Sequence, residues 1–351
     1  MSSMASIFSV IFGALFFFSS AYGQSTEMDL HKKYERDKAR FLAFESKHRG
    51  VVEAVNHRIS YLKWGDSKDK VLIWLPGSFL SAYDFYPFAE QLVKDGYTVL
   101  SVDHYGHGLT HIPERDLDFW DFADDLAAVM DSLHIQKAVL GGFSRGGYLA
   151  TAFYDKHPQR VSGLVLEDGG TVAFRSLFDQ MGPAGRHDFL RSVTPPPEVQ
   201  KLLFDRYGSE FEIYKNIDQL DGSAGQWQIF GFIRHVGDDW LLYHGLNEYM
   251  NMQDSLHYVQ VLNNAPDISK YASSMVRVDP LKTYSSLHVP MLIMDAVGKQ
   301  DTFGSEEGNR KLKAMHPDLI QHKIIDCADH NIHFACPQDF MAELQRFLDS
   351  L

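Results

Sequence analysis

The segment GGFSRGG, residues 141–147, places a serine and an arginine between two pairs of glycines. A serine hydroxyl is a weak nucleophile at neutral pH and attacks a carbonyl carbon only when a neighbouring base takes its proton. The pattern from Gly142 to Gly146 is G-x-S-x-G, which is typical of a sharp strand-to-helix turn that exposes the serine hydroxyl. Glycines at such a turn let neighbouring backbone approach closely. Ser144 is therefore our candidate nucleophile.

Two later loops carry the base and the acid that this serine would need. An imidazole takes the proton, and a carboxylate holds the imidazole in the right tautomer. The loop after the apolar run 291–294 carries Asp301, and the loop after the run 320–325 carries His330. The chain order Ser144, Asp301, His330 is the order expected for a nucleophile elbow of this kind.

Alternating strands and helices must bring these distant loops together. Continuous apolar runs are typical of strands that are buried on both faces, and segments with helical periodicity lie between several of them. The runs are residues 71–75, 97–102, 138–140, 163–166, 291–294 and 320–325. An edge strand over 57–62 and an amino-terminal helix over 31–48 are also predicted. We therefore expect an α/β fold with a doubly wound, mostly parallel sheet, whose strands end at one shared edge.

The alternation breaks between residues 171 and 286, which are helical in pattern and rich in aromatic side chains. Helices inserted late in the sheet would cover the carboxyl ends of the strands, where ligands bind. We predict a core formed by 24–170 and 287–351, and a helical cap formed by 171–286. The aromatic side chains suggest a pocket for a moderately apolar substrate, although they also serve as the cap's own core.

Four motifs together resemble the α/β-hydrolase fold family, specifically its cap-bearing members, from about residue 57 onward. They are Leu75-Pro76-Gly77-Ser78-Phe79, Asp103-His104-Tyr105-Gly106-His107-Gly108, the serine elbow, and the loops of Asp301 and His330. The family's acid lies in a Gly-x-x-Asp turn, which residues 298–301 match. Its histidine lies before a final helix that begins with proline, which His330 matches through Pro337.

The resemblance also implies where the oxyanion of the reaction would bind. Attack on a carbonyl creates a negative oxygen, which needs hydrogen-bond donors already aimed at it. In the family these would be the backbone N–H groups of Ser78 and Arg145. The family usually has His-Gly where this chain has Pro76-Gly77, so the geometry of that loop stays open. The Arg145 side chain could bind an anionic group of the substrate or form a surface salt bridge.

Each member of the proposed triad has a rival. Asp295 and Asp168 also stand at strand ends and could be the acid, while Asp301 could simply cap the following helix. His333 is the rival base. The match to the family pattern favours Asp301 and His330.

The remaining histidines and the cysteines predict no metal site and no cofactor. His330 and His333 have no further convincing ligands beside them. The two cysteines of the chain, Cys327 and Cys336, could form a disulfide outside the cytosol or remain as free buried thiols. A further group of histidines resembles a structural set in the family and receives no ligand role: His104, His107 and His111.

The composition and the amino terminus indicate the compartment and the class of partner. A formal net charge of −13 opposes binding to nucleic acid or to acidic membrane surfaces. The apolar run 7–18 is too short for a membrane span. Small residues follow it at positions 21 and 23, which predicts a signal peptide over 1–23 and a secreted or periplasmic protein. An uncleaved amino-terminal anchor is the alternative.

The residues and the resemblance together predict a serine hydrolase that acts on a small-molecule substrate. The expected reaction is acyl transfer to water through an acyl-enzyme on Ser144, with a carboxylic ester as the cleaved bond. Amide, lactone and carbon–carbon bond hydrolysis and a perhydrolase side activity use the same triad and stay open. A non-catalytic ligand-binding protein on the same fold is the alternative from another class.

Overall fold

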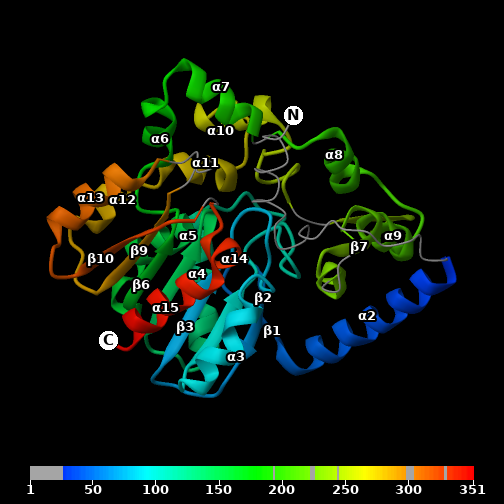
Figure 1. Ribbon diagram of the computed structural model, residues 1–351, viewed down its shortest axis with the longest axis horizontal. Coiled ribbons are helices and arrows are strands. Elements are labelled where there is room, and N and C mark those ends of the chain that lie inside the picture. The colour runs from blue at the N-terminus through cyan, green and yellow to red at the C-terminus, as the bar shows by residue number, and fades with distance from the viewer. Residues whose placement is uncertain (1–26, 193, 222–225, 243–244, 298–303, 328–329) are drawn as a thin grey trace.

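The computed structural model describes residues 27–192, 194–221, 226–242, 245–297, 304–327 and 330–351 (Figure 1). Within them, eight strands form one sheet in the order β1-β2-β4-β3-β5-β6-β9-β10. The β1–β2 and β2–β4 pairs are antiparallel, and all the pairs from β4 through β10 in this order are parallel. The strands are β1 (Arg49–Glu53), β2 (Arg58–Trp64), β3 (Val71–Leu75), β4 (Thr98–Val102), β5 (Ala138–Phe143), β6 (Val161–Glu167), β9 (Met291–Ala296) and β10 (Ile320–Ile325). The predicted doubly wound, mostly parallel sheet is confirmed.

The apolar runs are buried on both sides of the sheet, as their sequence predicts. In β3 all five residues are buried, and alternate side chains enter two different cores because successive residues of a strand point to opposite faces. Ile73 packs in the core that holds α4 (Phe119–Ser132) and α5 (Arg145–Lys156). Trp74 packs in the core that holds α3 (Tyr86–Lys94) and α15 (Pro337–Leu348).

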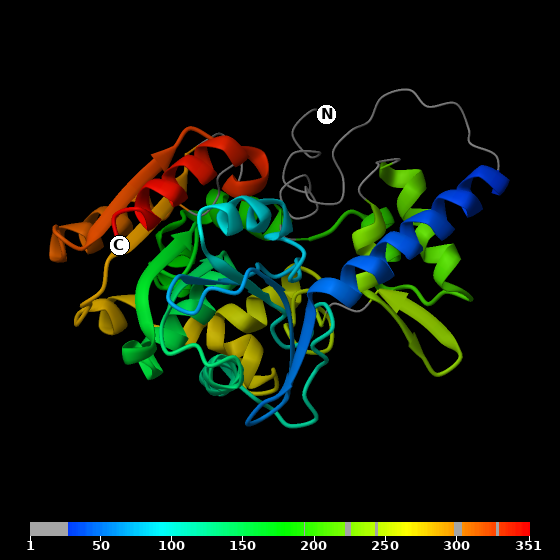
Figure 2. The same cartoon turned by 90° about the horizontal axis from the view of Figure 1, so that it is seen from below.

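The true edge strand differs from the predicted one. Residues 57–62 were expected at the edge, yet β2 pairs with β1 on one side and with β4 on the other. The strand at this edge of the sheet is β1, which follows the long helix α2 (Glu27–His48) directly. The sequence of β1 contains no apolar run from which a strand could be predicted. Helix α2 extends beyond the sheet and lies alongside α9 (Glu210–Asp221), as Figures 1 and 2 show.

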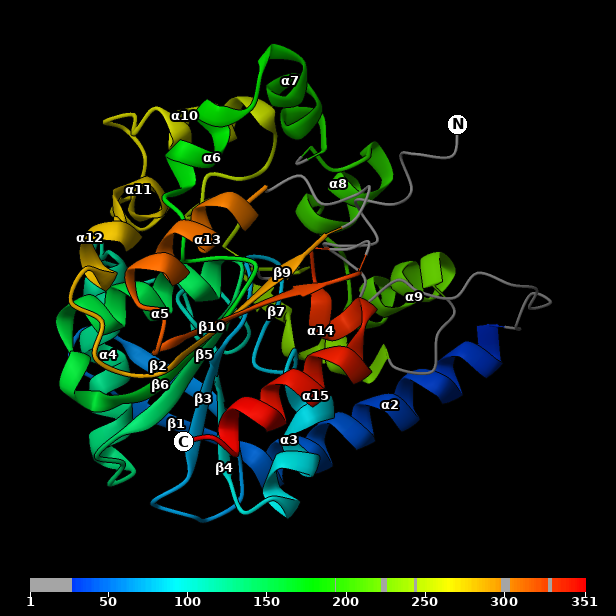
Figure 3. The same ribbon diagram turned by 60° about the vertical axis from the view of Figure 1, so that its left-hand side comes forward.

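The segment between β6 and β9 forms two groups of elements rather than one purely helical cap. Helices α6, α7, α10 and α11 contact one another at one end of the molecule, while α8, α9, η2 and the hairpin β7–β8 gather beside α2 (Figure 3). Their bounds are α6 (Phe174–Gln180), α7 (Pro183–Ser192), α8 (Pro197–Phe204), α9 (Glu210–Asp221), η2 (Gln226–Gly231), β7 (Ile233–Val236), β8 (Asp239–Leu242), α10 (Ser255–Leu262), α11 (Lys270–Arg277) and α12 (Pro280–Tyr284). The hairpin is the part that the helical pattern did not predict.

The signal peptide expected over residues 1–23 lies outside the described residues. None of the helices in the described ranges is both long enough and apolar enough to cross a membrane.

Candidate active site

Ser144 stands at a strained turn between β5 and α5. Its backbone has φ 50° and ψ −117°, a conformation that is costly for a residue with a side chain and that recurs at functional sites. The turn requires the glycines on both sides. A Cβ on Gly142 would lie 2.3 Å from the carbonyl of Gly146, and a Cβ on Gly146 would lie 1.9 Å from the carbonyl oxygen of Leu75. The glycine pairs of the sequence therefore allow the elbow to form.

A small pocket of about 20 Å³, partly open to solvent, lies beside this turn. The core contributes Ser78, Ser144 and Asp168 to its wall, and the inserted segment contributes mostly apolar side chains. Those side chains are Val172, Phe174, Leu177, Tyr258 and Met275. Ser78, whose backbone N–H is a predicted oxyanion donor, thus faces the same space as Ser144. Arg145, the other predicted donor, is the first residue of α5, where helical N–H groups have no partner within the helix.

The carboxylate that holds His330 is that of Asp168. Oδ2 of Asp168 lies 2.5 Å from Nδ1 of His330, and both side chains are buried. Asp301 lies outside the described residues, so its predicted role stays a prediction. Asp168, an alternative that the sequence left open, occupies the position on Nδ1 that the acid of a triad takes. Burial raises the pKa of Asp168, and the neighbouring His330 opposes that rise.

The positions of Asp168 and His330 relative to Ser144 follow from the neighbouring strands. Asp168 comes directly after β6, which pairs with β5, and the loop after it is so close that a Cβ on Gly169 would lie 2.3 Å from the carbonyl oxygen of Ser144. The ring of His330 lies 4.8 Å from that of Phe143, the residue before Ser144. The nucleophile, the imidazole and the carboxylate therefore gather at the carboxyl ends of β5, β6 and β10.

A disulfide closes the loop that carries His330. Cys327 and Cys336 are bonded, which decides between the two possibilities that the sequence left open. Within the loop, the side chain of Asn331 accepts a hydrogen bond of 3.0 Å from the backbone N–H of Phe334 and caps the short helix α14 (Ile332–Ala335). These two constraints hold the backbone on either side of the imidazole.

Comparison with known proteins agrees with the fold. A family model described as the alpha/beta hydrolase fold matches residues 70–202. The crystal structure of E-2-(acetamidomethylene)succinate hydrolase covers 86% of this chain and 98% of its own, with a TM-score of 0.60 at 18% identity, which is a likeness of fold. The chain has the α/β-hydrolase fold.

Two curated relatives show how far the likeness extends along the sequence. The chain is 33% identical over 104 residues to the AB hydrolase superfamily protein YisY of Bacillus subtilis, which is 29% of this chain and 39% of that protein. It is 26% identical over 182 residues to the bifunctional esterase/perhydrolase DCH of Acinetobacter calcoaceticus, which is 50% of this chain and 58% of that protein. The chain thus spans less than two thirds of the length of these relatives.

Asp295, the other alternative acid, forms its contacts with Ser305, Asn309 and His322. One of its oxygens accepts hydrogen bonds from Ser305 Oγ at 2.9 Å and from Asn309 Nδ2 at 2.6 Å, and the other lies 2.5 Å from Nε2 of His322. Ser305 Oγ also lies 3.2 Å from Oδ1 of Asp168. Asp295 is therefore linked to Asp168 through Ser305.

The imidazole of His333, the alternative base, lies between two carboxylates. Its Nδ1 lies 2.7 Å from Oε2 of Glu167, and its Nε2 lies 2.8 Å from Oδ1 of Asp84. All three side chains are about 99% buried or more. The two carboxylates outweigh the opposing effect of burial and raise the pKa of His333 to about 10. An imidazolium with both nitrogens occupied cannot take a proton from Ser144, so His333 is a buried cation that fixes the end of β6.

The stability of the protein should therefore fall in alkaline solution. A histidine whose folded pKa lies above its unfolded value stabilises the fold fully below the unfolded pKa of about 6.5 and loses that contribution as pH rises through about 10. We expect the melting temperature of the wild type to decline between these two values. His333→Gln should have a lower melting temperature at pH 7 and a flatter profile. An NMR titration in which His333 loses its proton near pH 6.5 would contradict this assignment.

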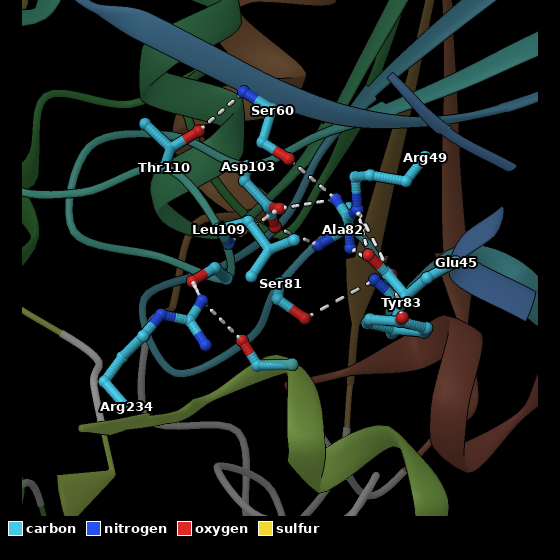
Figure 4. Close-up of polar contacts among 12 residues, drawn as sticks. Glu45, Arg49, Ser60, Ser81, Ala82, Tyr83, Asp103, Leu109, Thr110 and Arg234 are labelled. Carbon is cyan, nitrogen blue, oxygen red and sulfur yellow. Dashed lines mark hydrogen bonds and ion pairs between the residues drawn. The ribbon is translucent and has the colours of Figure 1, made fainter. Parts of the chain in front are cut away.

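A buried ion pair that the sequence did not suggest, between Arg49 and Asp103, positions the loop after β3, which carries Ser78 (Figure 4). Asp103, at the end of β4, accepts hydrogen bonds from the backbone N–H groups of Ala82 at 2.6 Å and Leu109 at 3.1 Å, and from Arg49 at 2.8 Å. Nε2 of His107 lies 2.6 Å from the carbonyl oxygen of Ser78. The loops after β3 and β4 are thereby tied to one carboxylate. Arg49 escaped prediction because it belongs to β1, which has no apolar run.

The histidines near this loop form no metal cluster in the part of the chain that the structure describes, where no three His, Cys, Asp or Glu side chains are arranged to hold an ion. Instead, Nδ1 of His104 lies 2.7 Å from the hydroxyl of Tyr271.

Proposed function

We propose that this protein is a serine hydrolase that cleaves a carboxylic ester of a small to medium, moderately apolar substrate through an acyl-enzyme. The observation that carries the proposal is the bond of 2.5 Å between Asp168 and His330, at the same sheet edge as the strained turn of Ser144. The largely apolar wall of the adjoining cavity supports the moderately apolar substrate.

The reaction follows from the roles of these groups. Oγ of Ser144 attacks the carbonyl carbon while Nε2 of His330 takes its proton, and Asp168 stabilises the imidazolium that forms. The backbone N–H groups of Ser78 and Arg145 donate to the oxyanion. The intermediate then expels the alcohol, which receives the proton from His330. Water, deprotonated by the same imidazole, attacks the acyl-enzyme and releases the acid and free Ser144.

Other bonds stay possible substrates for the same groups. One similar solved structure bears the name of a hydrolase of 2-(acetamidomethylene)succinate, and a curated relative is named an esterase and perhydrolase. Amide, lactone and carbon–carbon bond hydrolysis therefore belong in the same substrate screen, and the ester is the bond that we propose. A ligand-binding protein without catalysis is the alternative.

We also propose that the protein works outside the cytosol. The predicted signal peptide is the main argument, and the disulfide between Cys327 and Cys336 supports it, because such bonds persist in oxidising compartments.

Labelling with a fluorophosphonate tests the proposed function. This reagent modifies serines that an adjacent base has activated. We expect one adduct, on the peptide that contains Ser144, together with hydrolysis of short p-nitrophenyl esters. Ser144→Ala should show neither the adduct nor the hydrolysis. If the folded wild type shows neither the adduct nor ester hydrolysis, the non-catalytic alternative is correct.

A further inference from the structure

The side chain of Arg145 is a buried cation beside the nucleophile. The expectation of a surface salt bridge is wrong, because only 1% of this residue is exposed and, among the described residues, the charged-group influences on its guanidinium come from tyrosines and not from a carboxylate. Its Nε donates a hydrogen bond of 2.9 Å to Oγ of Ser78, and its Nη2 lies 2.8 Å from the sulfur of Met252. Its Nη1 is buried and has no hydrogen-bond partner in the described structure.

The other neighbours of Arg145 do not supply a negative charge. The guanidinium lies 5.9 Å from the ring of Phe119 and 5.8 Å from that of Tyr271, so two aromatic faces offset part of the cost of burying it. His104 adds no second positive charge beside the guanidinium. Burial, together with the nearby His107 and Arg145, holds the pKa of His104 well below its usual value, so the imidazole is neutral at pH 7. A charge without a counter-ion is costly inside a protein, and such positions are commonly functional.

The guanidinium lies directly behind the wall of the active-site cavity. Ser78, whose Oγ accepts the hydrogen bond from Nε, lines that cavity. Tyr258 also lines it, and the positive charge of Arg145 opposes the rise in the pKa of Tyr258 that burial causes. Met252 lies between α10 and the hairpin β7–β8 in the inserted segment and contacts Nη2 from that side. A thioether sulfur is a weak acceptor on a flexible side chain, which makes Met252 an easily displaced partner.

We propose that Arg145 binds a carboxylate of the substrate, and that this carboxylate displaces Met252 from Nη2. The inference rests on the proposed hydrolase function and names its substrate class, an ester that carries a carboxylate on one side of the scissile bond. The two Nη groups form one edge of the guanidinium. That edge matches the two oxygens of a carboxylate, and it now holds only a sulfur contact and an unpaired nitrogen.

A matched pair of esters tests this selectivity. The probes are p-nitrophenyl hydrogen glutarate and p-nitrophenyl methyl glutarate, which carry a carboxylate and its uncharged methyl ester, respectively, at the far end. Succinate and adipate analogues vary the reach. A charged hydrogen bond inside a protein corresponds to about a 10- to 100-fold effect. We expect the wild type to prefer the charged ester by this factor in kcat/KM for one chain length, and Arg145→Met to lose the preference.

The control carries the same substitution at an exposed site. Arg277→Met removes the same charge from a cap arginine whose side chain is 41% exposed, so the preference should survive there. A merely structural Arg145 would lower both esters equally and leave their ratio unchanged in Arg145→Met. That result, or a wild-type ratio near one for every chain length, would overturn the proposal.

A binding measurement separates this inference from the proposed function. In Ser144→Ala, glutarate should raise the melting temperature more than its dimethyl ester does, and the added change Arg145→Met should remove the difference. If this difference is seen but the wild type hydrolyses no ester, the carboxylate site is supported and the hydrolase function is refuted. If the wild type hydrolyses both esters without a preference for the charged one, the hydrolase function is supported and the carboxylate site is refuted. Equal shifts with chloride, acetate and glutarate would indicate a site for any small anion and would overturn a substrate carboxylate.

Discussion

His330→Ala should lower kcat for ester hydrolysis by about 10⁶-fold, the loss typical of removing the base from a complete serine–histidine–acid triad. His333 cannot replace His330, because Glu167 and Asp84 occupy both of its ring nitrogens. The check is the steady-state rate on short p-nitrophenyl esters, with circular dichroism to show that the variant is folded.

The matched control for this result is His333→Gln. It should lower the melting temperature, because it leaves Glu167 and Asp84 buried without their cation, and it should change kcat of the folded protein far less than His330→Ala does. If His333→Gln alone abolished hydrolysis in a folded protein while His330→Ala did not, the base would be His333.

Asp168→Asn should lower kcat by about 10⁴-fold with little change in KM. The amide keeps the size of the side chain, but it no longer stabilises the imidazolium and it favours the wrong tautomer of His330. Asp168 is the acid of this prediction because its Oδ2 lies 2.5 Å from Nδ1 of His330. Measurement of kcat and KM across pH separates this catalytic loss from weaker substrate binding.

Two further asparagine variants make this test decisive between the rival acids. Asp301→Asn should retain most of the activity. Asp295→Asn should lower the melting temperature, since it breaks the contacts with His322, Ser305 and Asn309, and should lower kcat less than Asp168→Asn does. A 10⁴-fold loss in Asp301→Asn beside a nearly active Asp168→Asn would restore the acid that the family pattern favours.

The acid that pairs with His330 could not be chosen from the local sequence alone. Asp168, Asp295 and Asp301 all follow apolar runs, and local sequence gives each of them the same access to the sheet edge. One signal was available. The strand that ends before Asp168 follows the serine helix directly, and in a doubly wound sheet successive strands are commonly neighbours. That argument favours a carboxylate one strand away from Ser144, and the structure places Asp168 there.

The sequence by itself determined the features that depend on short stretches of chain. Continuous apolar runs form strands that are buried on both faces, and the glycines around Ser144 allow a turn that side chains would block. The sheet and the elbow could therefore be predicted from residues close together in the sequence.

Only the tertiary structure decided which distant groups meet. The bond between Asp168 and His330 joins residues 162 positions apart, and the disulfide state, the burial of Arg145 and the carboxylates around His333 depend in the same way on packing. The physical reason is that a hydrogen bond or an ion pair forms over a few ångströms and depends on direction, whereas the sequence pattern fixes each loop only to an edge of the sheet.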